Sequence, residues 1–405
     1  MCRCFITDKK IMNILLKLQH AFQCLKMATL IKKGQVLDSK VELEMLELNA
    51  ISRSARIYIK NYGLSKEAQL KIFELDNTLE LVKMYTKWHK LCKEAEIKML
   101  EHPNATELVK SYIQQYRLRE EAELKLFELK DAFELVKLYI QNHNLYDEGE
   151  LKMFELNNAS ELVKSYIQKY EFFYDSELKM FELDDATEIV KMYIQKYRLC
   201  DDAQVKIFEL KNATELVKIY IQKYSLCDEA EIKMLEHPNS LELVKMYIQE
   251  YKFCDNAEVK MLEHSNSLEL IKLYIQEHEL CDEAEIKILE HQNVVDLVNL
   301  YIKESGFCNE TELKMFEHPN SLELVKLYIQ EYELYDNAQV KMLEHQNSLE
   351  LVKLYIQEHE LCDNAQVKIL EHPNSLELAK LYIDSGHLLC PRAQQMLLIL
   401  LLNKE

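Results

Sequence analysis

The sequence of 405 residues is poor in residues that break helices, with only five glycines and five prolines. So few of them leave little material for β-turns, glycine-rich loops or linkers between domains. It also has a single tryptophan and no apolar run long enough to cross a bilayer. The first residues, MCRCFITDKKIMN, lack the apolar core and small-residue cleavage site of a secretory signal, so we expect a cytoplasmic protein.

Motifs for nucleotide binding and hydrolysis are absent as well. Neither phosphate-binding pattern, G-x-x-x-x-G-K-[ST] or G-x-G-x-x-G, occurs, and neither G-x-S-x-G nor H-E-x-x-H does. An enzyme needs unlike groups gathered at one asymmetric place, and a nearly perfect repeat provides the opposite. We therefore expect no catalysis and no cofactor.

Basic residues are outnumbered, with 50 Lys and Arg against 69 Asp and Glu, and the net charge is −19. Such a field repels phosphate backbones, so a general nucleic-acid binder would need a local basic stripe to overcome it. We expect a protein or peptide partner with basic residues, no DNA and no membrane.

What the sequence has in abundance is a repeat. Alanines recur at multiples of 27 residues from Ala68 to Ala365, and thirteen copies of the unit cover residues 41–391. A period of this length is typical of a solenoid, in which no unit buries its own apolar face. We predict an all-α solenoid of about thirteen helix-turn-helix repeats, with a degenerate cap over residues 1–40 and an apolar capping helix over residues 392–405.

One unit, residues 257–283, shows how its two helices are specified. Asp255 with Glu258 has the three-residue spacing of a capping box and predicts the start of the first helix, called helix A. Asn266 with Glu269 has the same spacing and predicts the start of helix B. Helix B carries one apolar stripe at three- and four-residue steps, which predicts that it packs against its neighbours.

Two columns of the repeat, one of tyrosine and one of cysteine, are interpreted as packing. The tyrosines fall within the apolar stripe of helix B, so we expect them in the core. The cysteine position elsewhere holds Arg, Tyr or Phe, and equivalent thiols would lie roughly 9 Å apart, too far for a disulfide. We expect free, half-buried thiols, which fit a reducing cytosol. The columns are Tyr85, Tyr112, Tyr139, Tyr166, Tyr193, Tyr220, Tyr247, Tyr274, Tyr301, Tyr328, Tyr355 and Tyr382, and Cys92, Cys200, Cys227, Cys254, Cys281, Cys308 and Cys362.

A row of six histidines ends helix A in the second half, where most earlier units carry leucine. Repeat spacing keeps the rings apart, so we expect no metal site. A partly protonated ring at this position suits the helix dipole and can bond a free carbonyl. Alternatively, the row makes partner binding sensitive to mildly acid pH. The six are His237, His264, His291, His318, His345 and His372.

The best candidates for binding lie on helix B of the second half. An apolar column there runs beside a column that changes from lysine in the first half to glutamate in the second. The apolar residues either contact the adjacent unit or line a groove edged by acids. In the second case, a segment with Lys or Arg would bind along the array. The predicted binding residues are Met246, Glu250, Leu273, Glu277, Leu327, Glu331, Leu354 and Glu358.

Two other functions stay open. The apolar stretch MLLILLL, residues 396–402, would let the array associate with itself as a structural spacer. The basic column of the first half, Lys169, Lys196 and Lys223, would contact RNA or a phosphorylated ligand.

The pattern V-K-M-L-E-H-P-N-S-L-E-L-V, seen in fragments across most of the array, resembles leucine-rich variant repeats, which pair a short helix with a longer one around an N-P-x-[ST] turn. Those units are shorter, and their turn has Asn-Pro where this chain has Pro238 followed by Asn239. The array is also similar to tetratricopeptide-like solenoids, whose longer units display peptide-binding faces. The resemblance implies a helical binding scaffold with no catalytic residues to carry over.

Overall fold

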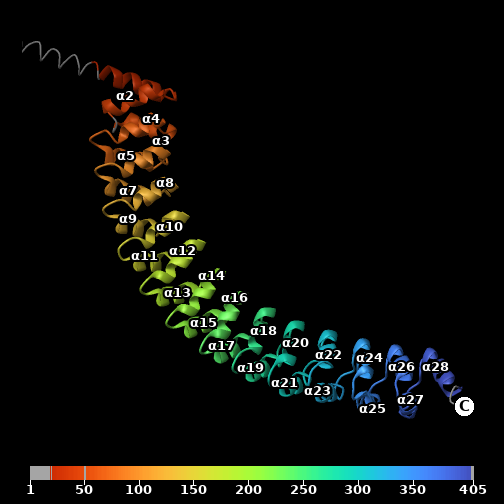
Figure 1. Ribbon diagram of the computed structural model, residues 1–405. Coiled ribbons are helices and arrows are strands. Elements are labelled where there is room, and N and C mark those ends of the chain that lie inside the picture. Colours follow the sequence, from red (N-terminus) through yellow and green to blue (C-terminus); the bar gives the residue numbers. More distant parts are fainter. Residues whose placement is uncertain (1–18, 20, 50–51, 403–405) are drawn as a thin grey trace, which may run out of the picture. The chain divides into compact units, whose positions relative to one another are not determined.

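The computed structural model describes residues 19, 21–49 and 52–402, and this part of the chain contains α-helices, two short 3-10 helices and no strand (Figure 1). The predicted all-α solenoid is confirmed. The chain divides into two compact units, residues 1–197 and 198–405. Within each unit, successive even-numbered helices pack on one another, and so do successive odd-numbered helices. We call these two sets layer A and layer B.

Unit 1 contains the first repeats. Its described part begins with residue 19 and the helical residues 21–32. Residues 1–18 and 20 of the predicted cap, and with them the segment that lacks a secretory-signal pattern, lie outside the described residues. Layer A consists of α2 (Ser39–Asn49), α4 (Lys66–Ile72), α6 (Lys93–Leu100), α8 (Glu120–Leu126), α10 (Asp147–Phe154) and α12 (Tyr174–Lys179), which η1 (Met180–Glu182) extends. Layer B consists of α3 (Arg53–Tyr62), α5 (Thr78–Thr86), α7 (Ala105–Ile113), α9 (Ala132–Tyr139), α11 (Ala159–Tyr166) and α13 (Ala186–Ile194).

Unit 2 continues the same alternation. Layer A consists of α14 (Asp201–Lys206), which η2 (Ile207–Glu209) extends, α16 (Asp228–Glu236), α18 (Asp255–Leu262), α20 (Asp282–Glu290), α22 (Asn309–Met315), α24 (Asp336–Glu344), α26 (Asp363–Glu371) and α28 (Pro391–Leu402). Layer B consists of α15 (Ala213–Ile221), α17 (Ser240–Tyr247), α19 (Ser267–Tyr274), α21 (Val294–Tyr301), α23 (Ser321–Tyr328), α25 (Ser348–Glu358) and α27 (Ser375–Asp384). Helix α28 packs against α26, and residues 403–405 of the predicted capping helix lie outside the described residues.

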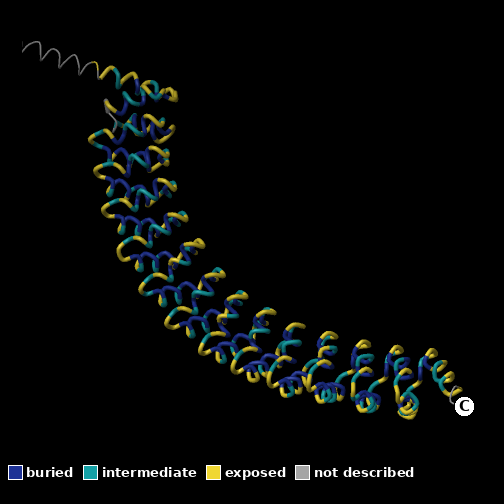
Figure 2. The backbone as a smooth tube through the Cα atoms, in the orientation of Figure 1, coloured by how far each residue is buried: buried dark blue, intermediate teal, exposed yellow. Residues whose placement is uncertain are grey.

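Packing between layers A and B buries the core of each unit (Figure 2). In the middle of unit 2, Ala257 and Met261 of α18 and Leu270 and Tyr274 of α19 are fully buried. Helices this short are marginal in water on their own, so they depend on burial against their neighbours. All twelve tyrosines of the predicted core column are buried, which confirms their placement.

Both predicted capping boxes are wrong. Cys254 is the N-cap of α18 and makes no side-chain cap bond, so Asp255 already lies within the first turn. The side chain of Glu258 does not reach back to the helix start, because it is buried and accepts a hydrogen bond from Tyr274. Asn266 is the N-cap of α19 but again makes no side-chain cap bond. The spacing marks the helix starts, whereas the glutamate of helix A serves the core.

In most repeats, a buried glutamate of helix A forms hydrogen bonds that link the repeat to the next one. Tyr247 donates its hydroxyl hydrogen to Glu231 Oε1 at 2.7 Å and accepts the N–H of Leu226 at 3.2 Å. The second oxygen, Glu231 Oε2, accepts the N–H of Cys254, the N-cap of the following A helix, at 2.7 Å. One carboxylate thus fixes its own B helix and the start of the next repeat. The same pair of bonds forms at Glu42, Glu96, Glu123, Glu150, Glu258 and Glu285.

Glutamine replaces this glutamate in several repeats and keeps the link between repeats. Gln204 Oε1 accepts the N–H of Cys227 at 2.7 Å, and its Nε2 donates to the carbonyl of Leu199 at 2.9 Å. An amide has no charge to desolvate, whereas a buried carboxylate does. Burial accordingly raises the pKa of Glu231 and raises the pKa of Glu123 to about 7. The position requires a buried acceptor and tolerates either side chain.

Candidate partner-binding surface

The eight predicted binding residues all lie on layer B of unit 2, in two columns that differ in exposure. The apolar column is half-buried, so each of its side chains contacts the fold and still presents area to solvent. The acidic column is exposed. The half-buried residues are Met246, Leu273, Leu327 and Leu354, and the exposed ones are Glu250, Glu277, Glu331 and Glu358. Helices α17, α19, α23 and α25 carry the four apolar residues and Glu358, whereas Glu250, Glu277 and Glu331 lie in the turns that directly follow the first three of these helices.

The exposed acids lie at the C-terminal end of a B helix or in the turn just beyond it. The N–H of Glu250 donates to the carbonyl of Tyr247, the last residue of α17, and Glu358 is the last residue of α25. A helix C-terminus carries negative partial charge, so a carboxylate there is unfavourable. Within the described part of the chain, none of the four predicted acids forms an ion pair. A cation from outside the chain would relieve this repulsion.

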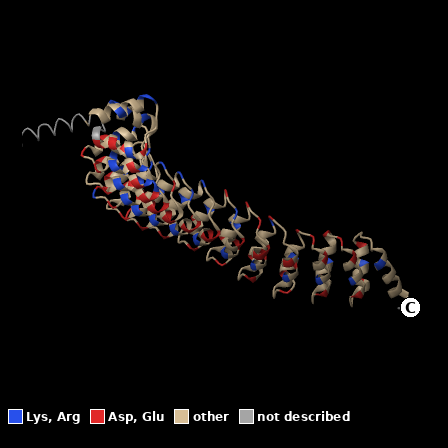
Figure 3. Cartoon of the chain, turned by 90° about the horizontal axis from the view of Figure 1, so that it is seen from above, with Lys and Arg blue, Asp and Glu red and all other residues tan. Residues whose placement is uncertain are grey.

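Other acids of layer B are neutralised by lysines of the preceding repeat. Lys245 Nζ lies 3.1 Å from Glu269 Oε1, and Lys353 Nζ lies 2.7 Å from Glu377 Oε1. Figure 3 shows basic and acidic positions recurring on successive helices. Exposed pairs of this kind contribute at most about 1 kcal/mol each. These pairs neutralise acids within the B helices, whereas the acids at the helix ends have no such lysine partner.

The lysines of the first half have partners within the fold. Lys169 Nζ donates to the carbonyl of Gln141, and Lys196 Nζ donates to the carbonyl of Gln168, both at 2.6 Å. Each lysine therefore caps the C-terminus of the preceding B helix, where a cation is favourable. The sequence change from lysine to glutamate replaces a stabilising helix cap with an unfavourable charge.

A second apolar column escaped the sequence prediction. It occupies the second position of each B helix from α17 to α27, and its most exposed member, Leu268, has 41 % of its area accessible. Leu322 of this column and Leu327 of the predicted column line one shallow hollow, which widens the apolar surface. The sequence signal that could have revealed this column was the change at this position from threonine or serine in earlier repeats, as at Thr187, to leucine or valine from Leu241 onward. The column consists of Leu241, Leu268, Val295, Leu322, Leu349 and Leu376.

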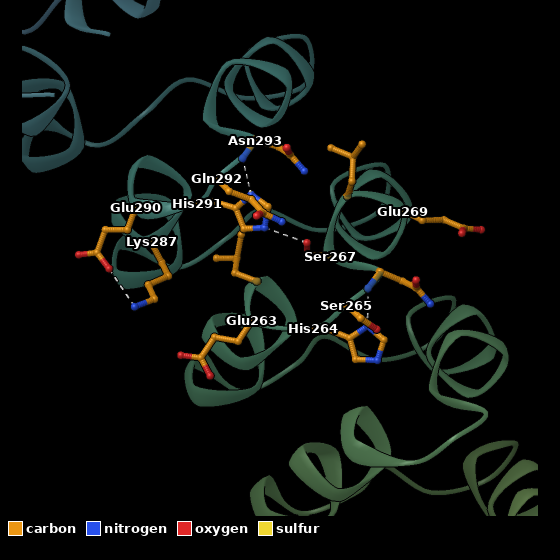
Figure 4. Close-up of a pocket in the computed structure, with 13 residues that line it drawn as sticks. Glu263, His264, Ser265, Ser267, Glu269, Lys287, Glu290, His291, Gln292 and Asn293 are labelled. Carbon is orange, nitrogen blue, oxygen red and sulfur yellow. Dashed lines mark hydrogen bonds and ion pairs between the residues drawn. The ribbon is translucent and has the colours of Figure 1, made fainter. Parts of the chain in front are cut away.

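The histidine row links neighbouring repeats. His264 Nδ1 accepts the N–H of Asn266 at 3.0 Å, and its Nε2 lies 3.0 Å from Ser240 Oγ of the preceding repeat. His291 makes the equivalent contacts in the next repeat, as Figure 4 shows. Burial lowers the pKa of both rings, so they are neutral at pH 7. The expected bond to a free carbonyl is wrong, because the turn offers Nδ1 an N–H group instead.

Histidine and serine replace an apolar pair together. The two positions hold Ala105 and Leu129 in unit 1 but Ser267 and His291 in unit 2. The residue 24 positions before His318 is Val294 and not serine. The Nε2 atom of His318 accordingly has no hydrogen-bond partner in the part of the chain that the structure describes. Where histidine replaces leucine and serine replaces the upstream apolar residue, the second half of the array therefore has a hydrogen bond between repeats in place of an apolar contact.

The cysteines within the described ranges show no features of a reactive or metal-binding site. The predicted column is half-buried and free of disulfides, as expected. Burial raises the pKa of Cys281 to about 11 and that of Cys254 to about 12, so these thiols stay protonated and unreactive. Among the described residues, no three His, Cys, Asp or Glu side chains lie close enough to hold a metal ion. No helix in the described ranges has the length and apolar content to span a bilayer.

No family model matches the chain, and no curated protein matches it. The class of protein therefore rests on the architecture itself, an all-α solenoid of regularly paired helices. Of the resemblances noted in the sequence, the structure supports the coarser one, a solenoid of repeated helix pairs.

Proposed function

We propose that the chain is a non-catalytic scaffold that binds a protein or peptide carrying Lys or Arg through layer B of unit 2. The observation that carries the proposal is the row of exposed, unpaired acids at helix C-termini beside two partly exposed leucine columns. We define this binding surface by Glu250, Glu277, Glu331, Glu358 and the half-buried residues Met246, Leu273, Leu327 and Leu354. A partner with basic and apolar side chains complements both columns.

The energetics of this surface support a binding role. Each acid at a helix C-terminus costs roughly 0.3–1 kcal/mol, and nothing within the described fold offsets it. The leucine columns offer apolar area whose burial contributes about 25 cal/mol for each Å² removed from water. Apolar burial would supply affinity, and the acids would select a basic partner and speed its approach.

Charge reversal tests the proposal. We expect the fourfold variant E250K/E277K/E331K/E358K to lose the partner that the wild-type chain captures from a native lysate, as identified by mass spectrometry. The matched control is E236K/E263K/E317K/E344K, which reverses four exposed acids at the ends of layer A helices. Undiminished capture by the first variant, or equal loss with the control, would count against the proposed surface.

Self-association is a second candidate function, favoured by the terminal helix. Leu398, Ile399 and Leu402 of α28 are 60 %, 57 % and 66 % exposed, although they are large and apolar. Such a patch is typical of an interface. If the chain assembles through α28, removing residues 392–405 lowers the mass measured by light scattering to that of a monomer. An unchanged oligomeric state would exclude this route.

Two further expectations remain proposals. A cytoplasmic location is supported by the free, half-buried thiols, which persist in a reducing compartment. Contact of the first-half lysines with RNA or a phosphorylated ligand is tested by filter binding at low salt, where lack of retention would dismiss it. The capping contacts of Lys169 and Lys196 give these residues a structural role that needs no such ligand.

A further inference from the structure

The acids of the proposed surface recur once per B helix over five consecutive repeats. They are Glu250, Glu277, Glu304, Glu331 and Glu358, and all five are exposed. The B helices at whose C-terminal ends they lie, from α17 through α19, α21 and α23 to α25, pack directly against one another in that order. Packed helices lie about 8–10 Å apart, so the surface presents one carboxylate at about this interval.

This interval distinguishes between the conformations a bound segment could adopt. A polyproline II helix has three residues per turn and rises about 3.1 Å per residue, so every third side chain returns to the same side after about 9 Å. A β-strand returns after about 7 Å, and its fourth residue after about 13 Å. An α-helix presents same-side residues at about 5–6 Å, which is too close, or at about 10.5 Å when only every seventh residue is basic, which lies just beyond the interval. The polyproline II geometry fits one basic residue to each repeat.

Exposed amides beside the acids favour an extended partner for a separate reason. Gln249, Gln276, Gln330 and Gln357 immediately precede four of the acids and are exposed. Each side-chain amide offers both donors and an acceptor. The backbone of a polyproline II segment has no internal hydrogen bonds and leaves its carbonyls available to such amides, whereas an α-helix satisfies its own backbone.

Aromatic rings lie next to the acids of the proposed binding surface. Tyr251, His278, Tyr332 and His359 follow the acids directly and are half-buried. The ring of Tyr251 packs against Tyr247 with centroids 5.1 Å apart, and that of His278 packs against Tyr274 at the same distance. Partly exposed rings held in place in this way are what polyproline II segments contact in known recognition grooves. They also accept cations over their faces when the ring is Tyr.

From these features we infer that the partner segment binds in the polyproline II conformation and carries Lys or Arg at every third position, one for each repeat. This inference rests on the proposed function, because it specifies the conformation and charge spacing of the basic partner. Five acids would engage a segment of about 13 residues.

Labelled synthetic peptides test the inference in fluorescence anisotropy with the full chain. The first peptide repeats Lys-Pro-Pro five times. The second has the same composition with its lysines at every second position, and the third is an alanine-rich helix with lysine at every seventh. We expect the first to bind at least about tenfold more tightly than either of the others, since only its charges match all five carboxylates.

Isosteric neutralisation provides the matched controls. E250Q/E277Q/E331Q/E358Q should lower the affinity for the first peptide about tenfold or more, while E236Q/E263Q/E317Q/E344Q should leave this affinity unchanged. Equal or tighter binding of the second or third peptide, or no binding of any peptide, would overturn the inference. If a captured protein still depends on the four acids while the peptides show no preference for spacing, the inference fails and the proposed function survives. If charge reversal changes neither, both fail.

Discussion

The hydroxyl of Tyr247 donates a hydrogen bond to Glu231 Oε1 across 2.7 Å, within one repeat and away from solvent. The same hydroxyl accepts the N–H of Leu226, and the same carboxylate accepts the N–H of Cys254. Two side chains therefore satisfy two backbone groups in the loops on either side of one helix pair. In a fold with so few glycines and prolines, these bonds define where one unit ends and the next begins.

Removing the hydroxyl tests how much this bond contributes. Tyr247→Phe leaves Glu231 Oε1 and the N–H of Leu226 buried without that partner, so we expect the free energy of unfolding to fall by about 1–3 kcal/mol. Urea unfolding followed by circular dichroism measures it. The control is Tyr251→Phe on the same helix end, where the half-exposed hydroxyl should contribute less than about 0.5 kcal/mol. Equal effects of the two substitutions would show that the buried bond has no special weight.

The buried glutamates should make stability fall as the pH rises from about 4.5 to about 7. Burial raises the pKa of Glu123 from 4.5 to about 7, so its contribution is full below pH 4.5 and is lost as pH rises through 7. Glu123→Gln copies what Gln204 already does and has no charge to desolvate. Relative to wild type, we expect the variant to gain about 1–3 kcal/mol between about pH 5 and pH 8. Glu128→Gln, at an exposed position, is the control, and parallel pH profiles for E123Q and wild type would refute the effect.

The histidine row should act in the opposite direction, below neutrality. Burial lowers the pKa of His291 from 6.5, so its contribution is present above pH 6.5 and is lost as pH falls through the lower folded value. Glu263, Lys287 and Glu290 line the same hollow. Replacing the pair by its unit 1 counterpart, S267A/H291L, should reduce acid destabilisation by at most about 1.4 kcal/mol per pH unit. Chemical unfolding at a series of pH values checks this. If the unfolding free energies of the variant and the wild type fall equally steeply below pH 6.5, the prediction is contradicted.

The unpaired acids at the helix ends predict that replacing one of them by lysine raises stability and lowers affinity for the partner. Glu277→Lys places a cation at a helix C-terminus, as Lys169 does in unit 1, and should raise the free energy of unfolding by about 0.3–1 kcal/mol. The same substitution should weaken binding of the basic partner. Glu269→Lys, which removes the ion-pair partner of Lys245, is the control and should give no gain. Thermal unfolding provides the measurement, and destabilisation by Glu277→Lys would show that the acid has a partner within the fold.

The architecture could be predicted from the sequence because its cause is visible there. A 27-residue period and an apolar stripe on helix B, in which the column of Tyr274 lies, predict stacked helix pairs without knowledge of any distance. The binding columns could be placed on helix B for the same reason, since residues at equivalent positions of a repeat share a face.

The hydrogen bonds could not be predicted, because their partners lie in the neighbouring repeat. The three-residue spacing of Asp255 and Glu258 suggests a local cap, but the glutamate bonds the N–H of Cys281 instead. Likewise, nothing in the sequence around Lys169 shows that the carbonyl of Gln141 lies within its reach. Local patterns identify helix ends, whereas the choice among competing partners depends on how adjacent repeats stack.

The short reach of these bonds along the chain has an evolutionary consequence. Glu231 bonds residues 16 and 23 positions ahead, and even the link from His387 to the carbonyl of Ile356 spans only 31 positions. Loss or gain of a whole 27-residue segment by unequal crossover therefore restores the same neighbours on both sides of the junction. Such an array can change its length without redesigning any contact, so the number of acids offered to a partner can vary independently of the fold.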